Sequence, residues 1–216
     1  MLVNLKNIPL FRDLQKDELN AVAKQVAVKS FHKNAVVITE GEFTNSLYFI
    51  LSGRVKIHLN DENGKELVLD TKGPGGYFGE MVLDEGPRSA SVSTVEPCEF
   101  AVISITEFKN LLLKHSEIAL YVIKNLIHMG RALNKNVRSL AMLDVYGRVS
   151  RMLLDLAVEQ NGELVIPKKL TQLEMASKVA TSREMIYRVL RDLTAGGYIK
   201  VEDKRITIIK SLPSRY

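Results

Sequence analysis

The chain has 216 residues, of which 46% are hydrophobic, and a formal net charge of +5. These values fit one or two globular domains. There is no charged-then-apolar leader and no run of about 18 apolar residues, so we expect a cytoplasmic protein without a membrane partner. The single cysteine, Cys98, excludes an internal disulfide and a cysteine metal cluster, and the four histidines lack metal-site spacing. We therefore expect no metal and no required cofactor.

The positive charge is concentrated in one part of the chain. Residues 1–144 hold 17 Lys and Arg against 17 Asp and Glu, whereas residues 145–216 hold 13 against 8. The whole excess lies in the last third. Such asymmetry is typical of a nucleic-acid surface in one domain, although a solvated basic face without a partner has the same composition.

The N-terminal half opens with a helical pattern and continues as short β-rich runs. Leu19, Val22 and Val26 recur at helical spacing and predict a helix over 15–26. Glycine and proline turn signals then separate five β-rich runs, at 35–39, 46–51, 54–59, 66–70 and 90–103. Asn63-Gly64 marks a hairpin between two of them. This pattern predicts a small antiparallel roll or jelly-roll barrel.

One stretch of the roll, GGYFGEMVLDEGPRSASV over 75–92, carries anion-binding chemistry. Glycines such as Gly79 let backbone N–H groups approach an anion closely, and Arg88 offers a fork of donors that fits a phosphate. Glu80 would repel a bare phosphate but accepts hydrogen bonds from hydroxyls. Together these groups fit a ligand with a phosphate and a sugar hydroxyl. A surface salt bridge between Glu80 and Arg88 is the alternative.

Two helices follow the roll. Ser104 and Glu107 form a capping box that opens a helix over 104–115. A second helix over 116–143 has apolar residues at alternating steps of four and three, a heptad seam typical of a dimer helix: Ala119, Ile123, Leu126, Gly130, Leu133, Val137 and Leu140. The same seam could instead pack on its own domain.

The last third contains two closely spaced capped helices. Asp144 caps a helix over 145–159 that ends near Asn161-Gly162, and a short strand follows at 164–167. Thr171 opens a helix to about 178, and Thr181 with Glu184 opens another to 193. Two short helices joined by a tight turn, here at Ala180, are a helix-turn-helix. A hairpin of 198–201 and 205–209 around 202–204 completes a winged helix-turn-helix.

The second of these helices presents residues that read bases. Ser182, Arg183 and Glu184 fall in its first turn, and Arg188 lies one turn further along the same face. Arginine reads guanine and glutamate accepts from the cytosine amino group, so the set fits a half-site containing G·C pairs. We add Thr171 as a DNA-binding candidate. Alternatively, Glu184 serves only its cap and the arginines contact only phosphates.

The sequence resembles the cAMP receptor protein and FNR family of bacterial transcription regulators over nearly its whole length. The motifs that carry the resemblance are FGE at 78–80, PRSAS at 87–91 and SREMIYRVLRDLTAGGYI at 182–199. The resemblance implies an α+β fold: an N-terminal antiparallel β-roll, the cyclic-nucleotide-binding jelly roll, a long dimerisation helix, and a C-terminal winged helix-turn-helix. The implied domains are 1–115, 116–143 and 144–216.

The resemblance also implies a function. A cyclic nucleotide, cAMP, would be held at Gly79, Glu80, Met81, Arg88 and Ser89, with Glu80 on the ribose 2′-hydroxyl and Arg88 and Ser89 on the cyclic phosphate. Leu133 and Asn134 occupy the positions of the Thr-Ser pair that contacts adenine in relatives that bind cAMP. A homodimer would bind a TGTGA-like inverted repeat in double-stranded DNA, with RNA polymerase as a further partner.

The chain departs from the family pattern at two places. The segment between Glu80 and Arg88 is about one residue shorter than in many relatives, and neither Leu133 nor Asn134 is threonine. A regulator of the same fold that responds to cyclic di-GMP, or to no effector, is therefore the alternative. An enzyme is not expected, because the sequence has no nucleophile–base constellation and no Walker lysine.

Overall fold

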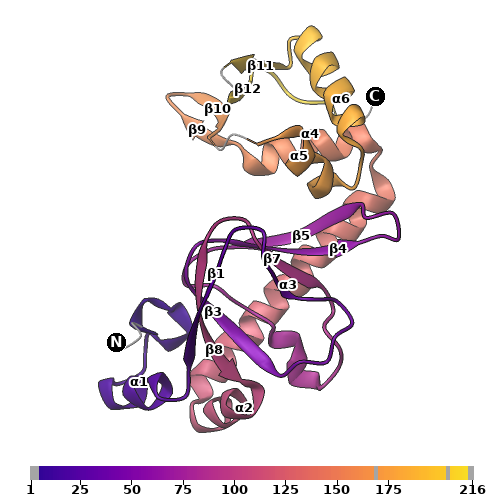
Figure 1. The fold of residues 1–216 in the computed structure, drawn as a ribbon. Helices are drawn as coiled ribbons and strands as arrows, with labels where there is room; N and C mark the ends of the chain where they lie inside the picture. Colours follow the sequence, from indigo (N-terminus) through magenta and orange to yellow (C-terminus); the bar gives the residue numbers. More distant parts are fainter. Residues whose placement is uncertain (1–4, 168–169, 203–204, 214–216) are drawn as a thin grey trace. The chain divides into compact units, whose positions relative to one another are not determined.

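The computed structural model describes residues 5–167, 170–202 and 205–213 (Figure 1). The described residues form two compact units, one of residues up to 60 with 68–129 and the other of 61–67 with residues from 130 onward. Within the described residues, no helix is both long and apolar enough to cross a membrane. The predicted boundaries after 115 and 143 stay predictions.

The first unit contains two four-stranded antiparallel sheets, in the orders β1-β8-β3-β6 and β2-β7-β4-β5. They remain separate and do not close into a barrel, which confirms the jelly-roll prediction in its open form. The strands are β1 Ala27–Phe31, β2 Val36–Ile38, β3 Ser46–Ser52, β4 Val55–Asn60, β5 Glu66–Lys72, β6 Tyr77–Phe78, β7 Ser91–Thr94 and β8 Cys98–Ser104.

The central strands β3 and β8 are buried on both faces. Successive side chains of a strand point to opposite faces. Leu47 and Phe49 of β3 therefore pack with the helices, whereas Tyr48 and Ile50 pack against the second sheet. A strand covered on both sides reads as a continuous apolar run, as SLYFILS does. This rigid double layer holds the loops that carry the candidate site.

The helices of the first unit cover the outer face of this sheet. Phe108 of α2 and Val122 of α3 share one core with Phe49. Ser104 caps α2, as predicted, by accepting a hydrogen bond from Glu107 N at 3.2 Å. The elements are η1 Leu5–Asn7, η2 Pro9–Phe11, α1 Lys16–Ala23, η3 Glu80–Asp84, α2 Ile105–Lys114 and α3 Ser116–Met142.

Two predictions in this half need correction. The run 90–103 is not one strand but β7 and β8, which lie in different sheets. The break falls at Pro97, which has no N–H to donate to a ladder. Strands β1 and β6 were not predicted, because β1 is mostly exposed and β6 has only two residues. The helix predicted over 15–26 is the shorter α1.

Helix α3 is a single helix of 27 residues. Its first turns bury Ile118 and Val122 against the core, and Leu126 is partly buried there. The heptad pattern assigned Leu126 to the seam, but this side chain packs on its own unit. The apolar residues that α3 leaves exposed are Leu120, Ile123, Ile127, Leu133, Val137, Leu140 and Met142.

The second unit packs three helices on a four-stranded sheet, in the order β11-β12-β10-β9. This arrangement is the predicted winged helix-turn-helix, although part of the wing turn predicted at 202–204 (203–204) lies outside the described residues. The elements are α4 Val145–Leu156, β9 Val158–Gln160, β10 Glu163–Ile166, α5 Gln172–Val179, α6 Arg183–Ala195, β11 Ile199–Glu202 and β12 Arg205–Ile208.

The helix predicted over 145–159 ends at Leu156 instead. Asp144 caps it as predicted, accepting from Gly147 N at 2.8 Å. Beyond its end, β9 pairs with β10 through Asn161 and Gly162, whose φ values are 53° and 81°. An Asn-Gly pair with positive φ at both residues is a tight hairpin turn. The sequence reading took this pair for a helix stop.

The turn of the helix-turn-helix is built as the sequence indicated. Ala180 takes the left-handed conformation, with φ 53° and ψ 53°, where glycine is common. Arg148 of α4 reaches this turn, donating from Nε to Val179 O at 2.9 Å. A cation on the last carbonyls of α5 is favourable for a helix C-terminus. The angle between α5 and α6 is thereby tied to α4.

The start of α6 differs from the prediction by one residue. Ser182, not Thr181, is the N-cap, and its hydroxyl accepts from Met185 N at 3.2 Å. Both residues are good caps, and serine ranks slightly above threonine. Glu184 is therefore the second helical residue and lies outside the predicted capping box.

Replacing the cap tests this assignment. Ser182→Ala removes the acceptor for Met185 N, so we expect the free energy of unfolding to fall by about 1 kcal/mol. Thr181→Ala is the matched control and should change it by less than about 0.5 kcal/mol. Urea unfolding of the unliganded protein, followed by circular dichroism, measures both. A larger loss for Thr181→Ala would contradict the assignment.

Candidate functional site

 The candidate site starts at the turn between β6 and η3, which lies within the FGE motif on which the family resemblance rests. Gly79 has φ 88°, a left-handed conformation that L side chains rarely adopt. A Cβ on Gly79 would lie 2.9 Å from Arg88 Nη1 and 3.1 Å from Ser46 O. The glycine is therefore required both by the turn and by the close approach of Arg88.

Arg88 is held from all sides of its guanidinium group. Its side chain donates from Nε to Thr44 Oγ1 at 2.7 Å, from Nη1 to Gly79 O at 2.9 Å and from Nη2 to Ser46 O at 2.6 Å. Its backbone N–H donates to Glu42 O at 2.9 Å. Arg88 thus joins the loop before β3 to the turn after β6.

Arg88 is buried, and its hydrogen bonds give it no anionic acceptor among the described residues. The residue is 4% exposed, and all three of its hydrogen-bond acceptors are neutral oxygens. Burial lowers the pKa of the guanidinium, while nearby Tyr48 and Glu80 raise it. Arginine nonetheless stays charged in proteins. Three of its five N–H donors are used by the described residues, so two remain for an anion.

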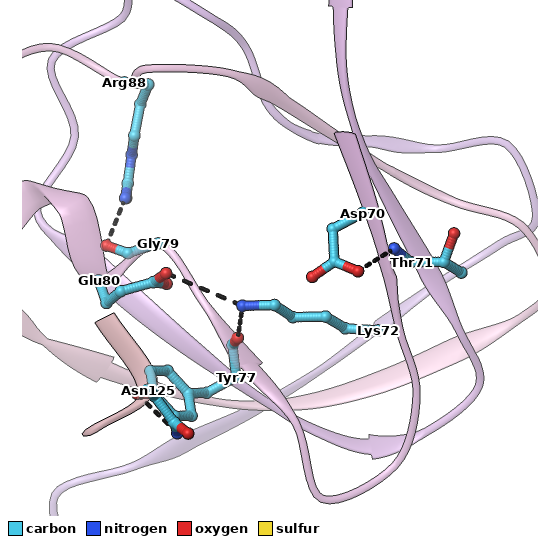
Figure 2. Close-up of polar contacts among 8 residues, drawn as sticks. All are labelled: Asp70, Thr71, Lys72, Tyr77, Gly79, Glu80, Arg88 and Asn125. Carbon is cyan, nitrogen blue, oxygen red and sulfur yellow. Dashed lines mark hydrogen bonds and ion pairs between the residues drawn. The ribbon is translucent and has the colours of Figure 1, made fainter. Parts of the chain in front are cut away.

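Glu80 is the second buried charge of the site. It is 3% exposed, and its Oε1 lies 3.8 Å from Lys72 Nζ. Lys72, at the end of β5, also donates to Tyr77 O at 2.9 Å. Figure 2 shows the Glu80 and Lys72 side chains pointing toward one another, with the Arg88 side chain reaching Gly79. The alternative reading of the sequence, a Glu80–Arg88 salt bridge, is not the pairing that these residues make.

Tyr77 connects this site to the long helix. Its hydroxyl accepts a hydrogen bond from Asn125 Nδ2 of α3 at 3.2 Å, drawn in Figure 2. Burial raises the pKa of the Tyr77 hydroxyl to about 12, although the bond from Asn125 lowers it. The hydroxyl is therefore neutral at physiological pH. Tyr77 thus contacts Lys72 through its backbone carbonyl and α3 through its side chain.

The structure brings together only part of the predicted effector set. Gly79, Glu80 and Arg88 lie side by side, and Met81 and Ser89 are exposed next to them in the chain. Leu133 and Asn134 are exposed on α3 in the second unit. Their predicted role at the nucleotide base stays a prediction.

Sequence reasoning missed three residues that shape this site. Thr44 precedes Arg88 by 44 residues, and no local pattern links the two. Asn125 is a polar residue on the packed side of α3. Lys72 had the clearest sequence signal of the three, because it lies directly before the Gly-Pro-Gly-Gly turn that leads into the stretch 75–92.

The exposed face of α6 carries the predicted base-reading residues. Arg183, Glu184 and Arg188 are exposed, whereas Ile186, Val189 and Leu193 anchor the opposite face in the core. Tyr187 is exposed on the same side as Arg183 and Arg188, and Met185 is partly buried against the core. The helix therefore presents two arginines, a glutamate and a tyrosine to solvent.

Both predicted DNA-binding hydroxyls, those of Ser182 and Thr171, have hydrogen-bond partners within the protein. Ser182 caps α6, and its hydroxyl also bonds to Glu184, whose carboxyl pKa is lowered by its own backbone N–H, by Ser182 and by Arg183 and Arg188. Thr171 caps α5, donating to Glu174 Oε2 at 2.9 Å and accepting from Glu174 N at 3.1 Å. Both hydroxyls fix helix starts.

Comparison with known proteins assigns both units. Residues 28–115 match the cyclic nucleotide-binding domain family, and residues 147–211 match the Crp-like helix-turn-helix domain family. The chain is 32% identical over 207 residues to the CRP-like cAMP-activated global transcriptional regulator of Mycobacterium tuberculosis, which covers 94% of this chain and 92% of that relative.

Two further comparisons span nearly the whole chain. The cAMP-activated global transcriptional regulator Vfr of Pseudomonas aeruginosa is 32% identical over 216 residues, covering 96% of this chain and 98% of Vfr. The solved structure of the c-di-GMP responsive global regulator CLP of Xanthomonas campestris matches with a TM-score of 0.76 at 28% identity, covering 91% of this chain and 100% of that one. The predicted family and fold class are thereby confirmed. The chain belongs to the CRP/FNR family of effector-responsive, DNA-binding transcription regulators, which are not enzymes.

Proposed function

We propose that this regulator is controlled by cAMP bound at Gly79, Glu80, Arg88 and Ser89. Arg88 and Ser89 hold the cyclic phosphate, and Glu80 accepts a hydrogen bond from the ribose 2′-hydroxyl. The observation that carries the proposal is the buried Arg88 guanidinium, whose hydrogen-bond acceptors are all neutral. A buried cation is costly unless it is paired. The phosphate supplies an anion that accepts hydrogen bonds from the remaining N–H donors of Arg88.

The relatives support this choice of effector. Two regulators that are 32% identical over nearly their full length are described as cAMP-activated. A second candidate, cyclic di-GMP, is favoured by the structure of a c-di-GMP responsive regulator at 28% identity. The two effectors share the cyclic phosphodiester chemistry that Arg88 fits, so binding experiments must include both.

Arg88→Leu tests the phosphate role. We expect the affinity for cAMP to fall at least about tenfold, because hydrogen bonds to charged groups are worth about 1.5–3 kcal/mol. Arg54→Leu, which changes an exposed arginine paired with Glu96, is the matched control and should bind cAMP like the parent. Calorimetric titration measures all three proteins.

Arg88 also ties two loops together, so its replacement has a structural risk. Arg88→Lys keeps the charge but loses the fork of donors, and we expect a loss of affinity smaller than that of the leucine variant. Circular dichroism reports whether each variant is folded. A folded Arg88→Leu protein that binds cAMP as tightly as the parent would show that the phosphate binds elsewhere.

The exposed apolar stripe of α3 fits a second copy of the chain. Ile123, Leu133 and Val137 are at least 48% exposed, and they continue the heptad spacing of the sequence. Exposed leucine, isoleucine and valine in a row along a helix are costly in water. A parallel homodimer about α3 would bury them, and Gly130 would let the two helices approach closely.

A charge on this stripe should prevent the dimer. Leu133→Asp would bury an unpaired carboxylate between two helices, which is costly. We expect monomers in analytical ultracentrifugation and loss of binding to inverted-repeat DNA. Ala132→Asp adds the same charge to an exposed neighbouring position outside the heptad seam and should leave the dimer intact. A Leu133→Asp protein that sediments as a dimer would move the interface to another surface.

The DNA-binding mode follows from the exposed face of α6. A recognition helix places its N-terminal residues against base edges in the major groove. Arg183 and Arg188 fit guanine, and Glu184 fits the amino group of cytosine. We propose a TGTGA-like half-site, repeated in inverted orientation and bound by one dimer. RNA polymerase is the partner through which the bound regulator acts.

Binding selections on random DNA test the base contacts. Arg188→Ala should cost about 1–3 kcal/mol and relax selection at one position, because a bidentate contact to guanine is lost. Arg191→Ala is the control, since Arg191 is paired with Asp192 on the same helix and should leave base preference unchanged. If Arg188→Ala weakens all sequences alike, Arg188 contacts phosphate only.

Coupling between the two functions requires that cAMP bind the DNA-competent state better than the other state. The bond between Tyr77 and Asn125 joins the effector site to the helix at the proposed dimer interface. A nucleotide that shifts Tyr77 would therefore act on α3 directly.

A further inference from the structure

We propose that Lys72 is a positioning residue of the effector site, which holds the Glu80 carboxylate ready for the ribose 2′-hydroxyl and so sets the preference for ribonucleotides. This inference rests on the proposed binding of a cyclic nucleotide at Glu80 and Arg88. It adds to the site a charged residue outside the cassette of residues 75–92.

Lys72 is fixed in place by contacts on both sides of its ammonium group. It closes β5, its side chain is 17% exposed, and it donates to Tyr77 O at 2.9 Å. Its Nζ also lies 5.5 Å from the centre of the Tyr77 ring, within the range of a cation–π contact. Because Asn125 holds the Tyr77 hydroxyl, the support of Lys72 extends to α3.

Glu80 has this lysine as its ion-pair partner. A carboxylate that is 3% exposed needs a cation or several hydrogen bonds. Arg88 directs three donors to Thr44, Gly79 and Ser46. In the part of the chain that the structure describes, Lys72 is the cation within ion-pair distance of Glu80.

The separation of the pair leaves Glu80 available for a ligand. At 3.8 Å, Nζ attracts Oε1 by charge but is beyond hydrogen-bond distance. The carboxylate oxygens can therefore accept from a hydroxyl in a short, charge-assisted hydrogen bond. A 2′-deoxy ligand offers no such donor, so the held carboxylate discriminates against it.

The charges of the site match one phosphodiester. Arg88 and Lys72 are positive and Glu80 is negative, so the three carry a net charge of about one positive unit. A cyclic monophosphate carries one negative charge and neutralises them. Asp70, which Figure 2 shows on the same strand as Lys72, is exposed and accepts from Thr71 N at 2.7 Å. Its charge is screened by water.

The test compares two ligands that differ by one hydroxyl. cAMP and 2′-deoxy-cAMP are titrated into the intact parent, Lys72→Met, Lys72→Arg and the control Lys29→Met, which changes an exposed lysine of β1. We expect Lys72→Met to lose about tenfold in cAMP affinity and little in 2′-deoxy-cAMP affinity, as one charge-assisted hydrogen bond is worth about that factor. The ratio of the cAMP affinity to the 2′-deoxy-cAMP affinity should therefore fall about tenfold. Lys72→Arg and Lys29→Met should retain it.

A double-mutant cycle separates positioning from direct contact. In Glu80→Gln, the neutral amide does not need a cation, so adding Lys72→Met should change cAMP affinity less than it does in the parent. Equal losses in both backgrounds, or an unchanged ratio of cAMP to 2′-deoxy-cAMP affinity in Lys72→Met, would overturn the role of Lys72 alone. A parent that binds no cyclic nucleotide would overturn the proposed function and this inference together.

Discussion

The burial of a single cation, Arg88, is the constraint on which the N-terminal site depends. The guanidinium is 4% exposed and bonds to Thr44, Gly79 and Ser46, so the protein's own loops set its position. These acceptors orient the group but do not neutralise it. A site of this kind favours a small anion over water, because the orientation cost has been met by folding. In the proposed binding mode, phosphate recognition is therefore a property of the loops, whereas sugar recognition belongs to the Glu80–Lys72 pair.

The rest of the first unit explains how such a cation is kept in place. The sheet of β3 and β8 is packed on both faces, so the loops that leave it have rigid ends. Gly79 permits the close approach of Arg88, and the loop around Glu42 bonds to the Arg88 backbone. From this scaffold, Tyr77 reaches Asn125 on α3, the helix whose exposed stripe fits a second copy. The proposed effector site and the proposed dimer interface are thereby linked through α3.

The sequence predicted those features that local patterns encode. Gly79, Glu80 and Arg88 lie in one motif, and the caps Ser104, Asp144 and Thr171 follow rules that act over three residues. Long-range partners could not be predicted, since Thr44 and Ser46 meet Arg88 across more than 40 residues. The prediction also failed where two local structures fit the sequence almost equally well. Ser182, not Thr181, caps α6, and Asn161-Gly162 forms a hairpin turn instead of a helix end.

The most direct test of this account is calorimetric titration of the intact protein with cAMP and with cyclic di-GMP, repeated with inverted-repeat DNA present. The account predicts that cAMP binds once per chain, that cyclic di-GMP binds more weakly, and that cAMP and DNA each tighten the binding of the other, as linkage requires. If the protein binds cyclic di-GMP alone, or neither nucleotide, that result would contradict the claim that Arg88 binds the phosphate of cAMP.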